Sequence, residues 1–170
     1  MDAAALQLLV DHLYWVNRRL LDAAARLDQA TFVSSPTVAS RDLRATLVHE
    51  LDVEWSWRMA LEGRPPEAWS SDVELVADDF ADVATLRERW AADEAEMRAW
   101  LASLTDDDLS ATVHPGLSRT ARPLWQFVVH IVTHGAHQQA DAAALLTAAG
   151  ASPGEIGFLE FLGVTERGQG

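Results

Sequence analysis

The feature that most constrains how this sequence folds is a helical repeat of apolar residues, found in four long segments. In the first segment, leucines and valines recur every three or four positions, the spacing that gives a helix one apolar face. The alternation of apolar and polar residues that is typical of half-buried strands is nearly absent. Amphipathic helices must bury their apolar stripes against other elements, so this chain is expected to fold by packing helices on one another.

Breaker and capping residues divide the chain into these segments. Ser40 is the expected N-cap of the second helix, which Gly63 ends, and Pro123 is suited to the first position of the fourth helix. The helices are predicted at about residues 3–27, 41–62, 82–104 and 123–150, with irregular connections at 28–39, 64–80 and 105–121.

Four long helices of this kind predict an all-α fold, an up-down four-helix bundle. A capping box from Ser152 to Glu155 predicts a short extra C-terminal helix. The length of 170 residues favours one domain, which we place at residues 1–163. Residues 164–170 are expected to form a flexible C-terminal tail.

The composition excludes several classes of protein. The chain has 26 acidic and 13 basic residues, all of the latter arginine, and a formal net charge of −13. Such a chain is poorly suited to binding nucleic acid or an anionic membrane surface, which both require a basic face. The absence of cysteine excludes disulfides, thiolate metal ligands and cysteine nucleophiles.

The sequence also lacks the marks of a targeted or membrane-spanning protein. Its first residues carry Asp2 and Asp11 and no positive n-region. No apolar run approaches the roughly 18 residues that a membrane span requires. A cytoplasmic location is therefore expected.

Three of the six histidines fall close together on the fourth predicted helix. His130 and His134 are four residues apart, and His134 and His137 are three apart, so their side chains lie on neighbouring turns. This spacing is how helices present imidazoles to a metal, although such histidines also serve as ordinary hydrogen-bonding residues.

The angular positions of the side chains around this helix distinguish which candidate ligands face the bundle interior. Relative to the centre of its apolar face, Gln138 lies about 20° away and His134 about 60° away at ~100° per residue. His130 and His137 lie about 100° and about 120° away, towards solvent. His134 and Gln138 are therefore the residues expected to face the bundle interior.

The partner from another helix is His49, on the second predicted helix. The apolar pattern there is too broad to decide whether His49 points inward or is partly exposed. Trp55, Trp57 and Trp125 could line a cavity near these histidines, and proton acceptors or supporting partners could be Glu50, Asp52 and Asp141.

Nearly the whole chain resembles the DinB/YfiT-like superfamily of metal-binding four-helix bundles. The resemblance rests on the Tyr14–Trp15 to Asn17–Arg18 region and on the SRDL helix start at 40–43 that leads to His49. It rests also on RPLWQFVVHIVTHG at 122–135 and on Gly150 with the following SPG turn. In the family, a histidine of the second helix and an HxxxH pair of the last long helix hold zinc or nickel.

By position, the resemblance makes His49 and His134 metal ligands. The third ligand position falls on Gln138, because the chain reads HGAHQQ where family members often read HGxxHR. The nearest histidine is His137, one place earlier. Either a divalent metal is retained with Gln138 or a displaced His137, or the site has lost its metal. A carboxamide binds zinc-like ions more weakly than an imidazole does.

The function that the resemblance implies is that of a metal-dependent enzyme, either a thiol-dependent S-transferase or a hydrolase. Its partners would be a small-molecule substrate and a low-molecular-weight thiol, and a homodimer is a reasonable assembly. The alternative is a non-catalytic small-molecule-binding or stress-response bundle with a degenerate metal site.

Overall fold

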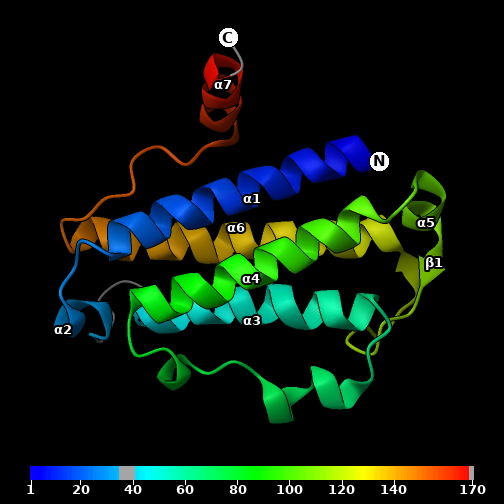
Figure 1. The fold of residues 1–170 in the computed structure, drawn as a ribbon, viewed down its shortest axis with the longest axis horizontal. Coiled ribbons are helices and arrows are strands. Elements are labelled where there is room, and N and C mark those ends of the chain that lie inside the picture. The colour runs from blue at the N-terminus through cyan, green and yellow to red at the C-terminus, as the bar shows by residue number, and fades with distance from the viewer. Residues whose placement is uncertain (35–40, 169–170) are drawn as a thin grey trace.

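The computed structural model describes residues 1–34 and 41–168. Four long helices, α1 (Ala3–Ala24), α3 (Leu43–Leu61), α4 (Val83–Ala102) and α6 (Leu124–Ala148), pack lengthwise into a bundle (Figure 1). The predicted all-α bundle is confirmed. The shorter elements are α2 (Gln29–Phe32), the 3-10 turns η1 (Pro66–Ala68), η2 (Ser71–Val73) and η3 (Ala77–Asp79), α5 (Asp106–Ser110), the strands β1 (Thr112–Val113) and β2 (Arg122–Pro123), and α7 (Phe158–Gly168).

Aspartates begin three of the long helices. The side chains of Asp2, Asp42 and Asp82 each accept a hydrogen bond from the backbone N–H three residues later. Their negative charge also interacts favourably with the positive end of the helix dipole. Ser40, the N-cap predicted for the second helix, lies outside the described residues. The structure begins α3 at Leu43, with Asp42 as its N-cap.

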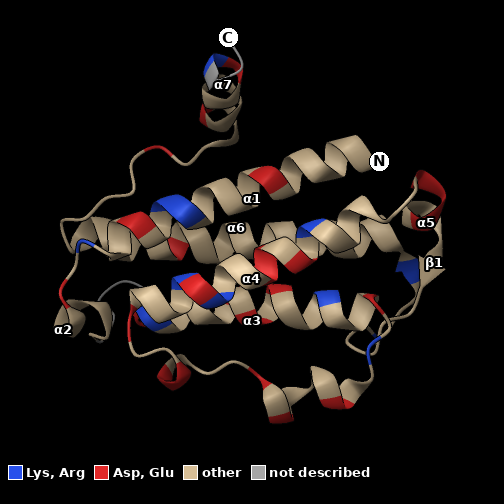
Figure 2. Cartoon of the chain, in the orientation of Figure 1, with Lys and Arg blue, Asp and Glu red and all other residues tan. Residues whose placement is uncertain are grey.

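The up-down order of the helices needs a correction. Arg44, at the start of α3, binds Asp78 just before α4, and Arg58, near the end of α3, binds Asp93 within α4. The helices α3 and α4 therefore run in the same direction, and the acidic connection from residue 62 to 82 returns along the bundle (Figures 1 and 2). A chain of this length can span a helix of 19 residues, which is about 30 Å long.

The first and last long helices form the second parallel pair. Gln139 of α6 binds Asn17 of α1, and Arg26 just after α1 binds the carbonyl of Ala151 just after α6. Neighbours from different pairs are antiparallel, as the contacts of Arg18 with Glu94 and of Arg98 with Asp11 show for α1 and α4. One face of α4 is buried in the bundle, and its apolar members are Leu86, Trp90, Met97 and Leu101.

The connections and the C-terminus are more ordered than the sequence predicted. The expected loops contain α2 and α5, and β1 pairs with β2, so that Pro123 precedes α6 rather than opening it. The extra C-terminal helix is present, but it begins at Phe158 and extends through residues 164–168, which were assigned to the tail.

The capping box at residues 152–155 starts no helix because α1 binds this segment. Arg19 donates to the carbonyl of Pro153, and Arg26 donates to the carbonyls of Ala151 and Ser152. These hydrogen bonds tie residues 151–153 to α1 and to its C-terminal end, and the chain continues without helix as far as α7. Within the described residues, no helix combines the length and the hydropathy that a bilayer crossing requires.

The close approach of α6 to α1 depends on Gly135. A Cβ atom added there would lie 2.5 Å from Leu13 Cδ1 and 3.2 Å from Glu50 Oε1. Both neighbours are fully packed, since Leu13 is 2% exposed and Glu50 is 0% exposed. We expect Gly135→Ala to lower the free energy of unfolding by about 1 kcal/mol or more, because overpacking outweighs the helix propensity that alanine adds.

The matched control is Gly163→Ala in α7, where the nearest contact is the mobile end of Arg167 at 3.3 Å. This variant should be neutral or stabilising. Urea unfolding monitored by circular dichroism measures both. Equal stability of Gly135→Ala and the unaltered protein would contradict the close packing described above.

Candidate functional site

His49 of α3 and His134 of α6 face each other across the bundle. The centroids of the two imidazole rings are 5.2 Å apart, and the ring planes are inclined at 75°. Both residues are half-buried. The antiparallel packing of α3 and α6 therefore brings together two side chains that are far apart in the sequence.

Both imidazoles are held in the neutral form. Burial is the main cause that lowers the pKa of His134 to about 4, and the neighbouring His49 and His130 add to it. Burial and the charge of Arg41 lower the pKa of His49 as well. A neutral imidazole has a lone pair available for a metal. His134 Nδ1 is buried and has no hydrogen-bond partner among the described residues, so one ring nitrogen of the pair is unsatisfied there.

The other candidate ligands lie further towards solvent. Gln138 is half-buried one turn after His134, whereas His137 and His130 are exposed. Within the described part of the chain, no three histidine, aspartate or glutamate side chains are grouped as a metal site requires. Two imidazoles are therefore in place, and Gln138 is the neighbouring side chain on the inner side of α6 that could add an oxygen.

A cavity of about 360 Å³ opens beside His49, between α3 and the returning connection. Asp52 and Glu74 line it together with His49 and Arg41. The Asp52 carboxylate accepts a hydrogen bond from the Leu75 backbone N–H at 2.8 Å, and burial raises the pKa of this carboxyl. The cavity thus places acidic groups next to one imidazole of the pair.

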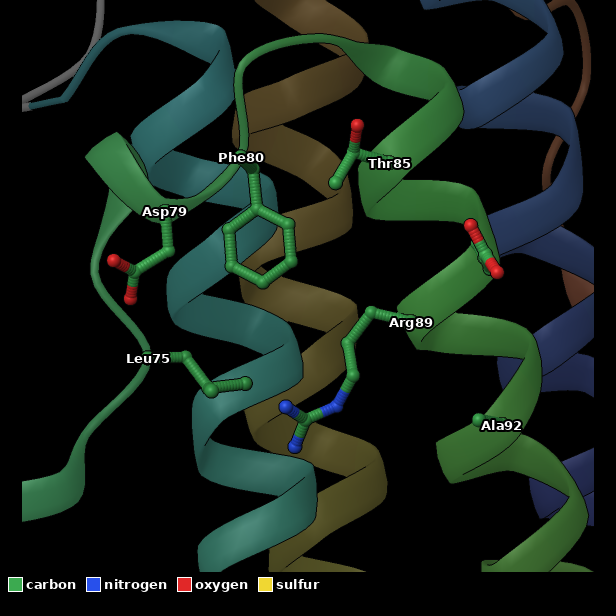
Figure 3. A pocket seen from close by; sticks show the side chains of 7 residues that line it. Leu75, Asp79, Phe80, Thr85, Arg89 and Ala92 are labelled. Carbon is green, nitrogen blue, oxygen red and sulfur yellow. The ribbon is translucent and has the colours of Figure 1, made fainter.

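A second cavity, of about 480 Å³, lies on the other side of Leu75, between η3 and α4 (Figure 3). Phe80 and Arg89 point into it, and none of its lining residues is a histidine. Trp55 lies on this side of the bundle, with the Arg89 guanidinium 5.5 Å from its ring centroid. Trp55 therefore does not line the histidine site.

The other two tryptophans expected near the histidines, Trp57 and Trp125, lie in different surroundings. Trp57 stacks on Phe127 at 5.5 Å and meets the His130 ring at 5.0 Å, so it lies beside the histidines of α6. Trp57 and Trp125 are both half-buried and pack against the hydrophobic core, but the ring contact with a histidine is made by Trp57. Trp57 is thus the tryptophan that the structure places next to the candidate site.

A buried polar network lies behind the histidine pair. The Gln139 side-chain amide donates to the Leu13 carbonyl at 3.1 Å, to Asn17 Oδ1 at 2.6 Å and to Glu50 Oε1 at 3.0 Å. Two amide hydrogens thus serve three acceptors. Glu50 is therefore a core residue, while Asp141, another proposed proton acceptor, is exposed.

The network continues to Glu54, one turn after Glu50. Asn17 Nδ2 donates to Glu54 Oε1 at 3.3 Å, and Trp90 Nε1 donates to Glu54 Oε2 at 3.2 Å. Burial raises the pKa of Glu54 to about 8, although these hydrogen bonds act in the opposite direction. Burial and the proximity of Glu54 raise the pKa of Glu50 well above its usual range.

Comparison with known proteins agrees with this architecture. The model of the DinB family matches residues 1–169. The chain belongs to the DinB family. A crystal structure of a conserved protein from Enterococcus faecalis is similar, with a TM-score of 0.64 and 15% sequence identity, and the match covers 82% of this chain and 94% of that one. At this identity the likeness shows the fold alone. No curated protein matches the chain.

This DinB-family chain differs from the sequence interpretation at one turn of α6. The helical wheel placed Gln138 nearest the centre of the apolar face, yet the glutamine that reaches the core is Gln139, which is 3% exposed. Leu145, one of the apolar residues at helical spacing that define the predicted face, is only half-buried. The core face of α6 is therefore rotated towards Gln139. The sequence did contain a signal for the inward position of Gln139. Glu50 and Glu54 lie four residues apart on α3, so both face the core, and buried acids require polar partners.

The raised pKa of Glu54 makes the stability of this DinB-family protein depend on pH. The folded chain holds the Glu54 proton more tightly than the unfolded chain does. The free energy of unfolding should therefore fall as the pH rises from the ordinary value of 4.5 to about 8. One group contributes a slope of at most about 1.4 kcal/mol per pH unit.

Glu54→Gln should reduce this slope, because it removes the titrating group, while Glu50 still contributes. It should also lower stability at pH 5, since its amide group turns a donor towards Asn17 or Trp90. Exposed Glu88 provides the control Glu88→Gln, which should leave the slope unchanged. Denaturant unfolding between pH 5 and pH 8.5 measures all three proteins. If the free energy of unfolding of Glu54→Gln depended on pH as steeply as that of the unaltered protein, Glu54 would not be the titrating group.

Proposed function

We propose that this DinB-family protein is a divalent-metal-dependent enzyme that acts on a small molecule at the His49–His134 pair. The observation that carries the proposal is the unpartnered, buried Nδ1 of His134 beside the neutral ring of His49. An unsatisfied buried nitrogen costs free energy, and a metal ion would satisfy it.

The donor set suits zinc or nickel. Both are commonly bound by imidazole, and His49 and His134 would supply two ligands, with Gln138 as the third. A bound ion of this kind supplies Lewis acidity, which lowers the pKa of a coordinated thiol or water. Thiol-dependent S-transfer is the chemistry that we favour, with hydrolysis as the second form of the same proposal.

The other groups of the site would bind the substrate and accept its proton. The cavity of about 360 Å³ beside His49 has room for a small molecule. The Asp52 carboxylate lies at its wall, and the hydrogen bond from the Leu75 N–H fixes one of its oxygens. Its other oxygen would accept a proton from a thiol or water that enters the cavity.

The alternative function is that of a binding protein without catalysis. It is favoured by the finding that no third histidine, aspartate or glutamate joins the pair within the described residues. In this alternative, the cavity holds a small molecule and the imidazoles contribute hydrogen bonds. Metal content separates the two functions.

The protein, purified without a histidine tag, should bind about one zinc or nickel ion per chain. His49→Ala and His134→Ala should each weaken zinc binding by at least tenfold, because each removes one of two imidazole ligands. His137→Ala is the matched control, since His137 is exposed on the same helix, and it should change zinc affinity little. Competition with a chromogenic chelator measures these affinities.

Gln138→His tests the third position. It should strengthen zinc binding by roughly tenfold, because an imidazole replaces a neutral carbonyl oxygen. If His137→Ala abolishes binding while Gln138→His has no effect, the proposed ligand set is wrong. If no variant and no loading condition yields bound metal, the binding-protein alternative replaces the enzyme.

A further inference from the structure

A third cavity, of about 440 Å³, lies at the end of the bundle where the loop before β2 meets α3 and α6. Its walls combine an aromatic surface with two arginines, a composition found at neither of the other cavities described above. The residues that matter to the argument are Trp57, Arg119, Arg122, Gln126, Phe127 and His130.

The two arginines carry charge that the rest of the chain does not neutralise. Neither Arg119 nor Arg122 forms an ion pair or a side-chain hydrogen bond with any described residue. By contrast, Arg58, Arg89 and other arginines of this protein of net charge −13 bind carboxylates. Two free guanidinium groups at one cavity create a local positive field that favours an anion.

The aromatic wall gives the cavity a second recognition element. Trp57 and Phe127 both line the cavity and stack with centroids 5.5 Å apart and planes inclined at 25°, so the buried Phe127 ring supports the half-buried Trp57 ring. The His130 ring meets Trp57 at 5.0 Å and lies 6.3 Å from the His134 ring. The cavity thus begins one helical turn before His134 on α6.

The loop that carries the arginines is held in place by its own hydrogen bonds. His114 Nε2 lies 3.0 Å from the Ser118 carbonyl, and the Ser118 N–H donates to the Pro115 carbonyl at 3.0 Å. Arg122 is fixed at the backbone, since it pairs with Val113 across the β1–β2 ladder. The two guanidinium groups therefore start from ordered backbone positions, which reduces the entropy lost on binding.

We propose that this cavity binds the oxyanion group, carboxylate or phosphate, of a small molecule whose flat apolar part lies on Trp57 and Phe127. A guanidinium donates two parallel hydrogen bonds to a carboxylate or phosphate, which gives both charge and orientation. The anion is held at Arg119 and Arg122, and the opposite end of the molecule points past His130 towards His134. This last step rests on the proposed function, and it makes the substrate or cosubstrate an amphipathic anion.

The test uses the whole protein after treatment with a metal chelator and dialysis into chelator-free buffer, so that it does not depend on the histidine pair and no chelator carboxylate competes with the probes. Three probes are titrated by calorimetry and by NMR: 3-phenylpropionate, phenyl phosphate and the neutral isostere 3-phenylpropionamide. At least one of the anions should bind about fivefold more tightly than the amide, a difference appropriate to exposed charges. The Trp57 indole and His130 ring signals should shift.

The double variant Arg119→Gln/Arg122→Gln should abolish the preference for the anion and leave amide binding unchanged. The control Arg64→Gln/Arg167→Gln removes the same charge from two exposed arginines that bind Glu62 and Glu160 elsewhere, and it should keep the preference. Trp57→Leu should weaken binding of the anion and the amide alike. Which anion binds distinguishes a carboxylate from a phosphate ligand.

Equal binding of anions and amide in the unaltered protein would overturn the proposal, as would equal losses in the two double variants. Neither result bears on metal content, so failure of the anion site and failure of the proposed metal chemistry are separate outcomes.

Discussion

The side-chain amide of Gln139 joins the two parallel helix pairs, α1 with α6 and α3 with α4. The rest of the structure depends on that junction. From α6 it donates to α1 at Leu13 and Asn17 and to α3 at Glu50, while Asn17 and Trp90 carry the network on to Glu54 and thus to α4. Buried polar groups are costly unless they are paired, so a shift of any of the four helices would leave an acid or amide unsatisfied. The network therefore favours one register.

This register also positions the histidine pair. His49 precedes Glu50 on α3, and His134 precedes Gly135, whose missing side chain lets α6 approach Leu13 and Glu50. The hydrogen bonds that fix Glu50 against Gln139 therefore fix the ring of His49 relative to that of His134. Side chains on rigid helices, backed by such partners, are held more closely than side chains on loops.

The sequence was sufficient for the four helices, because apolar periodicity and breaker residues such as Gly63 are local signals. The direction of α4 could not be predicted from local signals, since it depends on buried contacts between α3 and α4, such as those of Arg58 with Asp93 and of Trp90 with Glu54. The inward position of Gln139 was missed for a related reason. A helical wheel weights apolar residues, and Leu145 drew the calculated centre away from a glutamine whose partners lie on other helices. The proximity of His49 and His134 required the packing of α3 on α6.

Adjacent residues of α3 thus serve opposite sides of the helix. His49 and Asp52 line the cavity under the returning connection, whereas Glu50 and Glu54 lie in the core. A rotation of α3 large enough to bury His49 would bring Glu50 towards solvent and break its bond to Gln139. The buried acids therefore oppose the rotation that would close the site, and the half-exposed state of the imidazoles is maintained by the polar core behind them. Residues 49–54 of α3 therefore contribute both to the stability of the polar core and to the exposure of the imidazoles.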